Sequence, residues 1–454
     1  MKDFAPRLRI VLLLIVCLSL TSGTVEGDEV FLKNGRVLQG VVVEQNDSQV
    51  VIELAAGKMS LPRSMVERVT ISSSKLGDYQ QRAQALDESD VEGWLRLAFW
   101  AVDKRLDTKS QAAFGKVLEI DPDHIVAREV LGQLGPDDPS QPFTAEASLL
   151  AGVDDADFHT PWTVSSLVPA SAGAEPNAAA RGAVERVLSL AADCRWAEAS
   201  WRLREARREH GSHLDDGQSA AVLYALEVAA HTPNRQVEAL FTPEDVHFDR
   251  RSGVLFLRFE DASPLPWEFD GSVVGDGEGI DLSGAKSLDL RIPFRRSGQK
   301  RHLGTVEALD EPIRFEGRLL GAPGDAGLTM SWSTDDGSGP VSVASIRLSS
   351  DAEGRSSGEV TSVWKEDQAN YRKPKELPEG FLTEPRFLRA KVENGPVSFD
   401  VEGGFTDSMN LPRSRLMFLG LEGTEGRAVL DWISLSGAVD GLWIAWRLGL
   451  QARD

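Results

Sequence analysis

The 454-residue sequence predicts a multidomain α+β protein with a small N-terminal β-barrel, helical hairpin segments and a large C-terminal antiparallel β-sandwich. Three observations support this fold class. Short apolar runs separated by turn residues fill residues 28–72, helical periodicity fills 78–133 and 179–235, and two-residue alternation dominates 238–454. The length is also sufficient for two to four domains with cores of their own.

Residues 1–27 have the three parts of a secretory signal peptide. Cations come first, then an apolar run and then small uncharged residues: Lys2, Arg7 and Arg9, residues 10–20, and residues 21–24. The 11 apolar residues are fewer than the ~20 that a transmembrane helix needs, so we expect a periplasmic or secreted protein without a stable membrane span. Cys17 follows Val16 rather than a small residue, which disfavours a lipid-anchored N-terminus.

Charge and cysteine content narrow the function classes. A net charge of -21 argues against nucleic acid as a partner, because a polyanion selects basic surfaces. Beyond the predicted signal peptide the chain has Cys194 alone, so it forms no intramolecular disulfide. Cys194 lies in a helical pattern beside Ala192 and Trp196, and we expect it to be a buried apolar residue rather than a reactive thiol.

Residues 28–72 are predicted to form a small β-barrel of five short strands. The apolar runs are residues 30–32, 37–38, 41–43, 50–52 and 69–71. Asn34-Gly35 is typical of a type I′ hairpin turn, in which both positions need positive φ. With Gly40 and the closing Ile71, this pattern resembles the SH3-like or Sm-like barrels found at the N-termini of exported bacterial multidomain proteins.

Residues 78–133 are predicted to be helical. One apolar stripe consists of Trp94, Leu97, Ala98 and Ala101. Thr108 and Gln111 form a capping-box pattern, Asp123 is a second candidate cap, and Gly132 is a stop signal. Residues 112–128 resemble a tetratricopeptide-type repeat, but fewer than the usual ~3 repeats are present, so we expect these helices to pack on a neighbouring domain.

Residues 134–178 are rich in Pro, Asp, Ser, Ala and Gly and are predicted to be a linker, with one ordered piece near residues 158–167. Residues 179–235 are predicted to be a helical pair, and residues 194–203 again resemble a tetratricopeptide helix. One face of it carries Trp196, Ala199, Leu203 and Ala206. Arginines 202, 204, 207 and 208 alternate with glutamates 198, 205 and 209, which is typical of a solvated helix face.

From residue 238 to 454 the pattern predicts strands throughout, in one large sandwich. The order of strands resembles the concanavalin A-like lectin and glucanase jelly roll; another sandwich topology is the alternative. The resemblance rests on residues 254–259, 328–332 before Asp335-Asp336, 387–392, 397–403, 416–421 and 429–435. Members of this class bind or cleave glycans, so the resemblance implies a carbohydrate ligand.

The sequence predicts no catalytic residues. Glucanases of this class use a Glu-x-Asp-x-Glu pattern, and residues 238–454 contain none. The match at residues 88–92 precedes a helix, where Ser89 or Asp90 is expected to be an N-cap. Adjacent pairs such as Glu366-Asp367 and Glu260-Asp261 face opposite sides of a strand. Residues 354–358 fit Gly-x-Ser-x-Gly but lie between strands, where a nucleophile elbow does not form.

No cofactor or metal is predicted. Asp121, Asp123 and His124 match a turn between helices, and His210, His213 and His231 lack partners at metal-ligand spacing. Calcium at Asp335 and Asp336, or at Asp276 and Asp281, is compatible with the lectin resemblance without being demanded by it.

Tryptophans are the remaining candidates for ligand binding, because sugar rings stack on exposed aromatic planes. Trp267 and Trp364 lie in loop-like sequence and are the predicted ligand-binding residues, whereas Trp332 and Trp432 are expected in the core. We therefore predict a non-catalytic exported binding or scaffold protein whose partner is a glycan or an envelope protein. The alternatives are a glycan-processing hydrolase with carboxylates on separate strands and a purely structural envelope protein.

Overall fold

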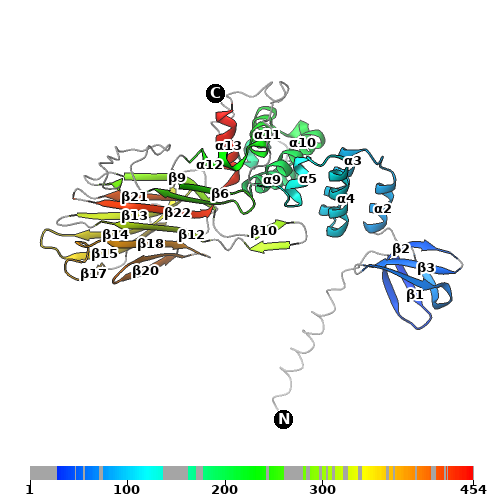
Figure 1. Ribbon diagram of the computed structural model, residues 1–454, viewed down its shortest axis with the longest axis horizontal. Helices are drawn as coiled ribbons and strands as arrows, with labels where there is room; N and C mark the ends of the chain where they lie inside the picture. The colour runs from blue at the N-terminus through cyan, green and yellow to red at the C-terminus, as the bar shows by residue number, and fades with distance from the viewer. Residues whose placement is uncertain are drawn as a thin grey trace, which may run out of the picture. The chain divides into compact units, whose positions relative to one another are not determined.

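A computed structural model describes most of the chain (Figure 1). The described residues are 28–46, 48–54, 57–70, 75–135, 162–169, 177–241, 245–259, 280–282, 287–295, 299–302, 305–308, 312–320, 326–335, 340–364, 368–371, 374–393, 396–410, 416–423, 426 and 428–452. The chain divides into two compact units, Met1–Ala127 and Arg128–Asp454. The predicted signal peptide at 1–27 lies outside the described residues.

The N-terminal unit begins with a five-stranded antiparallel sheet in the order β4-β3-β2-β1-β5. Its strands are β1 (Asp28–Leu32), β2 (Val37–Gln45), β3 (Gln49–Leu54), β4 (Gly57–Pro62) and β5 (Val66–Thr70). Val30, Val50 and Ile52 are fully buried in its core. Two predicted strands merge into β2, and β4 was missed because it contributes Leu61 to the core while Met59 is exposed, leaving no apolar run.

The turn between β1 and β2 differs from the predicted type I′ turn. Gly35 has φ 79°, whereas Asn34 is not among the residues with positive φ. Gly35 N donates to Leu32 O at 2.9 Å, and Leu32 N donates to Arg36 O at 2.8 Å. The loop therefore has three residues and ends in a left-handed glycine, which is the other common hairpin geometry.

Three helices follow: α2 (Lys75–Gln84), α3 (Val91–Asp103) and α4 (Asp107–Ile120). Asp90 caps α3 as predicted, accepting from Gly93 N at 2.8 Å. The capping box at Thr108 was wrong, because α4 begins at Asp107. The carbonyl of Leu106 already accepts from two amides of the first turn, so the helix starts before Thr108.

In the C-terminal unit, helices precede and follow the strands. They are α8 (Val164–Leu167), α9 (Ala178–Ala192), α10 (Trp196–His210), α11 (Asp216–His231), α12 (Asn234–Glu238) and α13 (Gly441–Gln451); α5 (Ile125–Val130) spans the boundary between the units. The region predicted as a helical pair holds three long helices, α9, α10 and α11, and α11 is buried without interruption from Ser219 to Ala230.

The prediction of strands to the end of the chain was wrong at α13, which packs on α11 and α9. Asp440 starts this helix by accepting from Leu442 N at 2.9 Å.

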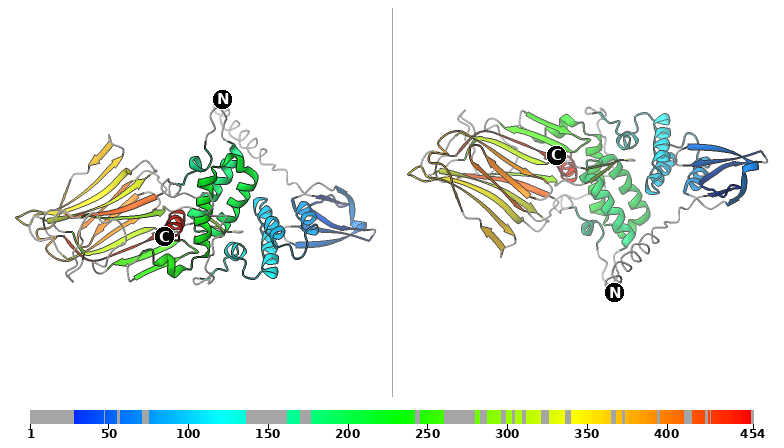
Figure 2. Two further views of the ribbon diagram at one scale, coloured as in Figure 1. Left: turned by 90° about the horizontal axis from the view of Figure 1, so that it is seen from above. Right: turned by 90° about the horizontal axis from the view of Figure 1, so that it is seen from below.

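The strands form a two-sheet antiparallel sandwich of the jelly-roll class, which confirms the predicted fold class (Figure 2). Sheet I has the order β20 (Phe405–Asn410), β19 (Pro396–Val401), β18 (Arg386–Val392), β12 (Ile313–Leu319), β22 (Val429–Ala438), β7 (Val254–Phe259), β6 (Asp245–Asp249), with β8 (Ile280–Asp281) beside β22. Sheet II has the order β16 (Gln368–Tyr371), β15 (Ser356–Trp364), β14 (Pro340–Ser350), β13 (Ala326–Asp335), β21 (Leu416–Gly423), β9 (Ser287–Arg295), with β17 (Lys375–Glu376) beside β15. A separate hairpin joins β10 (Gln299–His302) to β11 (Thr305–Ala308).

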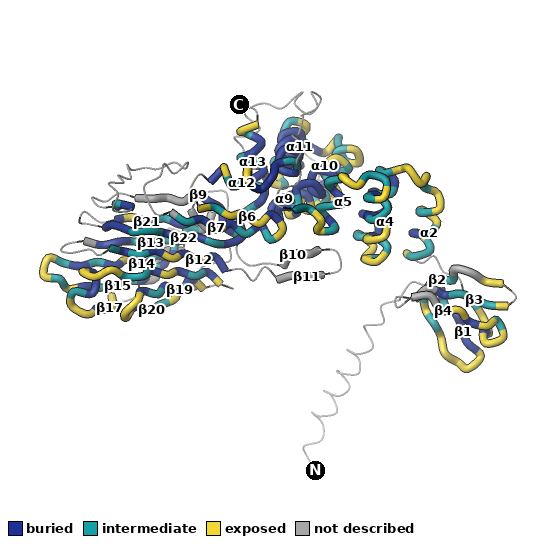
Figure 3. The backbone as a smooth tube through the Cα atoms, viewed as in Figure 1, coloured by how far each residue is buried: buried dark blue, intermediate teal, exposed yellow. Residues whose placement is uncertain are grey.

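The helices and the sandwich share one packed interior within the C-terminal unit. Trp196 Nε1 donates to Gly441 O at 2.8 Å, and the Trp196 ring stacks on Phe248 of β6 with centroids 6.3 Å apart. Arg295 of β9 donates to Ala192 O at 2.8 Å. Buried residues accordingly continue from the helices into the adjoining strands (Figure 3).

Candidate ligand-binding face

The outward surface of sheet I gathers aromatic and charged side chains from neighbouring strands. We call it the aromatic–charged face; it consists of Phe256, Arg258, Arg314, Glu316, Arg318, Phe387, Arg389, Lys391, Asp400 and Trp432. Strand β12 explains its origin, because Phe315 and Leu319 are buried while Arg314 and Glu316 are exposed. Side chains alternate along a strand, so the charged positions of β12 all face outward.

Two aromatic rings lie at one end of this face. Arg318 pairs with Trp432 of β22 on one side and with Phe387 of β18 on the other. The Trp432 and Phe387 ring centroids are 6.2 Å apart at an interplanar angle of 53°, and both residues are half-buried. The Arg258 guanidinium lies 4.8 Å from the Trp432 centroid, within cation–π range.

The position of Trp432 corrects the prediction that it fills the core. Ile433 and Leu435 are buried, so alternation places Trp432 and Ser434 on the outward side. Trp332 is fully buried, as predicted. The parity of β22 was visible in the sequence, and it was the signal that would have identified Trp432.

The residues paired across the strands next to the two rings include both acidic and basic side chains. Glu316, Arg389 and Asp400 are directly aligned on β12, β18 and β19. Arg389 Nη1 lies 3.3 Å from Asp400 Oδ2, and its Nε lies 3.9 Å from Glu316 Oε1. All three side chains are about half exposed, with 52%, 44% and 51% of the side-chain surface accessible for Arg389, Asp400 and Glu316. Exposed pairs of this kind contribute about 0–1 kcal/mol, so these groups are available to a ligand at little cost to stability.

The predicted ligand residues do not belong to this face. Trp267 lies outside the described residues. Trp364 is the last residue of β15, paired with Ser342 and Gln368, rather than part of a loop. It therefore belongs to sheet II, and the part of the structure that is described gives no position for its side chain.

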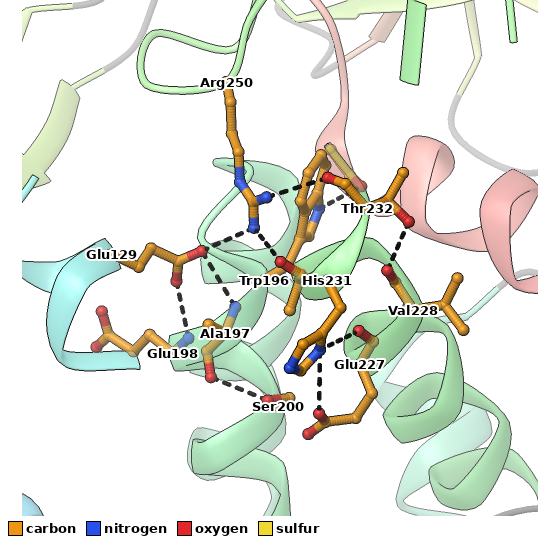
Figure 4. Close-up of polar contacts among 12 residues, drawn as sticks. Glu129, Trp196, Ala197, Glu198, Ser200, Glu227, Val228, His231, Thr232 and Arg250 are labelled. Carbon is orange, nitrogen blue, oxygen red and sulfur yellow. Dashed lines mark hydrogen bonds and ion pairs between the residues drawn. The ribbon is translucent and has the colours of Figure 1, made fainter. Parts of the chain in front are cut away.

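A second cluster of polar groups lies buried where the helices meet the sandwich (Figure 4). The Glu129 carboxylate accepts from Ala197 N at 3.2 Å and Glu198 N at 2.8 Å, at the first turn of α10. Arg250 donates to Ala230 O at 3.1 Å, at the end of α11, and lies 3.4 Å from Glu129. The acidic Glu129 thus lies at the N-terminus of α10, and the basic Arg250 lies at the C-terminus of α11. Each side chain pairs with free backbone groups of a helix end, which is a structural role.

Burial dominates the electrostatics of this pair. It raises the pKa of Glu129, against the opposing effects of Arg250 and the two amide donors. It also lowers the pKa of Arg250, against the attraction of Glu129. The adjoining pocket, of about 50 Å³, is lined by Glu129, Cys194, Arg195, Arg250 and four other residues. This is room for a few water molecules and not for a sugar ring.

Two sequence expectations near this cluster can be compared with the structure. Cys194 is 3% exposed, which confirms that it is buried, but it lies in the turn between α9 and α10 with φ 58°. The solvated face predicted for α10 was wrong at Glu198, which is buried and ion-paired with Arg195. Arg204 also reaches a buried carboxylate, Glu227 on α11, at 2.5 Å. The partner of Glu198 is the N-cap residue of α10 itself, whereas the partner of Arg204 comes from α11 and is not revealed by the sequence of α10 alone.

Asp121, Asp123 and His124, which were considered as metal ligands, lie in the turn between α4 and α5. Asp123 N donates to Asp121 Oδ1 at 3.2 Å, and burial lowers the pKa of His124. Within the described ranges, no three His, Cys, Asp or Glu residues are grouped so that they could hold a metal ion. Asp276 and Asp336 lie outside those ranges. None of the described helices has the length and apolarity required to cross a membrane.

Comparison with known proteins gives only distant structural neighbours. No protein family matches the sequence, and no curated protein matches it. The CBM2 module of the Lactobacillus casei BL23 phage J-1 evolved Dit is 11% identical, with 45% of this chain and 94% of that chain covered and a TM-score of 0.26. For the kappa-carrageenase from Pseudoalteromonas carrageenovora the identity is 14%, the coverage 40% and 92%, and the TM-score 0.26. Galectin LEC-6 of Caenorhabditis elegans is 12% identical, with 33% of this chain and 94% of that chain covered and a TM-score of 0.21. Similarity at this level assigns neither a ligand nor an activity to the chain.

Proposed function

We propose that this chain is an exported, non-catalytic binding protein whose β-sandwich holds a carbohydrate on the aromatic–charged face. The observation that carries the proposal is the outward position of Trp432 and Phe387 beside Glu316, Arg389 and Asp400. Aromatic planes match the apolar faces of sugar rings, and charged groups at their edges bind hydroxyls. Export rests on the signal-peptide pattern of residues 1–27.

The charge arrangement favours binding over hydrolysis. Glu316 and Asp400 are separated by one intervening strand, which puts their backbones about 9–10 Å apart. An inverting hydrolase keeps its two carboxyl groups about 6.5–9.5 Å apart with room for a water molecule between them. Arg389 lies between them and contacts both carboxylates, so its guanidinium occupies the space between the two.

The test uses the mature full-length chain on a glycan array, followed by pull-down on insoluble polysaccharides. Trp432→Ala is expected to weaken retention about tenfold, which corresponds to the loss of about 1.4 kcal/mol of stacking. Trp94→Ala is the matched control, because Trp94 is also half-buried but lies in the other unit. Retention that is insensitive to Trp432→Ala, or an absence of retention on every glycan, contradicts the proposal.

A reducing-sugar assay on the retained polysaccharides separates binding from hydrolysis. We expect no new reducing ends from the wild-type chain. Release of reducing ends that is abolished by Glu316→Gln would establish the hydrolase alternative instead.

A further inference from the structure

Two cations lie directly opposite each other on the aromatic–charged face. Arg314 of β12 pairs in register with Lys391 of β18, and both are on the outward side of the sheet. Like charges in this position destabilise a sheet. Lys391 Nζ lies 2.5 Å from Glu393 Oε2, whereas within the described residues Arg314 is exposed and has no acidic partner. A chain with a net charge of -21 thus places two cations side by side on this face.

An exposed aromatic residue lies in the same row. Phe256 of β7 pairs with Ser436 of β22, and Ser436 pairs with Arg314. Phe256 is 37% exposed, so its ring is open to solvent. It lies two strand spacings from Arg314, about 10 Å along the row. Beyond Lys391 the row continues to Ser398, a small polar residue that leaves the surface open.

We propose that the ligand of this face is an acidic glycan whose carboxylate or sulfate groups lie between Arg314 and Lys391. This inference rests on the proposed glycan-binding function and adds the ligand class. An anion between the two side chains turns their repulsion into two charge-assisted hydrogen bonds. A sugar ring stacks on Phe256 along the same row, and Ser436 hydrogen-bonds to hydroxyls; Ser398 Oγ donates to Lys391 O at 3.2 Å and accepts from a ligand hydroxyl. The ligand is recognised locally, because the net charge of the whole chain repels polyanions.

The test compares one backbone with and without anions: dextran, carboxymethyl-dextran and dextran sulfate, each immobilised and presented to the full chain. We expect stronger retention on at least one anionic form than on dextran, and retention that falls as salt is raised. Arg314→Gln and Lys391→Gln are each expected to weaken the anionic retention about tenfold. Arg347→Gln is the matched control, because Arg347 is an exposed arginine on sheet II, opposite Glu359; it is expected to leave retention unchanged. The two anionic matrices show whether carboxylate or sulfate is preferred.

Thermal unfolding distinguishes a binding role of Arg314 and Lys391 from a structural one. Removing one of two like charges is expected to leave the melting temperature unchanged or to raise it, while binding is lost. Equal retention on dextran and on both anionic forms, together with sensitivity to Trp432→Ala, overturns the acidic ligand and leaves the proposed function standing. Loss of retention by Arg347→Gln to the same degree also overturns it. Absence of retention on every glycan contradicts both proposals.

Discussion

Arg250 is expected to be among the most destabilising positions for substitution in the C-terminal unit. Its side chain is 7% exposed and lies 4.7 Å from the centroid of Trp196. It donates to the carbonyls of Ala230 and Thr232, at 3.1 and 3.4 Å, and provides the cation next to Glu129. Arg250→Met keeps much of the volume, removes all these donors and leaves a carboxylate buried without its partner.

The expected cost is about 3–5 kcal/mol, the usual result of removing one member of a buried ion pair. Glu129→Gln in the Arg250→Met background removes the orphaned charge while leaving a carbonyl for the amides of α10. The double variant is therefore expected to regain about 1–3 kcal/mol relative to Arg250→Met, the coupling typical of groups in contact.

Urea unfolding followed by tryptophan fluorescence measures these free energies, with Trp196 as the local reporter. Arg251→Met is the matched control, since Arg251 is the next residue and is exposed; a change within about 0.5 kcal/mol is expected there. The reasoning is refuted if Arg250→Met costs no more than the control, or if the Glu129 and Arg250 substitutions are additive.

Further predictions concern the same junction. Because burial raises the pKa of Glu129, its contribution to stability is full below the ordinary glutamate pKa and is lost as the pH rises through the folded value. The unfolding free energy of the wild type relative to Glu129→Gln is thus expected to fall from acidic to neutral pH, and a pH-independent difference would contradict this. Gly441→Ala puts a Cβ 2.7 Å from Cys194 Sγ and closer still to Ala191 O. We expect it to cost about 1–3 kcal/mol in calorimetry, as overpacking does, whereas Gly115→Ala, with open space around it, is the control.

The sequence predicted the fold class well because it depends on local periodicity. Short strands, amphipathic helices and alternating strands each leave a pattern within about ten residues. The pattern fails where burial is uniform or partners are distant. Residues 179–235 were predicted to hold a helical pair and hold three long helices, and Glu198 was taken for a surface charge because its backbone contact with the distant Glu129 leaves no local pattern.

The candidate face was missed for a different reason. Trp432 was assigned to the core on its size, whereas the buried positions of Ile433 and Leu435 set the parity of the strand. The sequence of a strand shows which residues lie on the same side. A position known to be buried is needed to decide which side faces the core. The alignment of Arg314 with Lys391 requires the register of two strands that are far apart in the sequence, which no local pattern contains.

The helical layer also covers one of the two edges of sheet I. Strand β6 is the last strand of the sheet, and an edge strand exposes backbone groups that can pair with other chains. Phe248 N donates to Glu238 Oε1 at 2.8 Å, and Phe248 O accepts from Asn234 Nδ2 at 3.1 Å. Side chains of α12 thus satisfy the centre of the edge, and Trp196 covers the Phe248 ring. Helix α12 and Trp196 thus cover this edge strand and stabilise the sandwich.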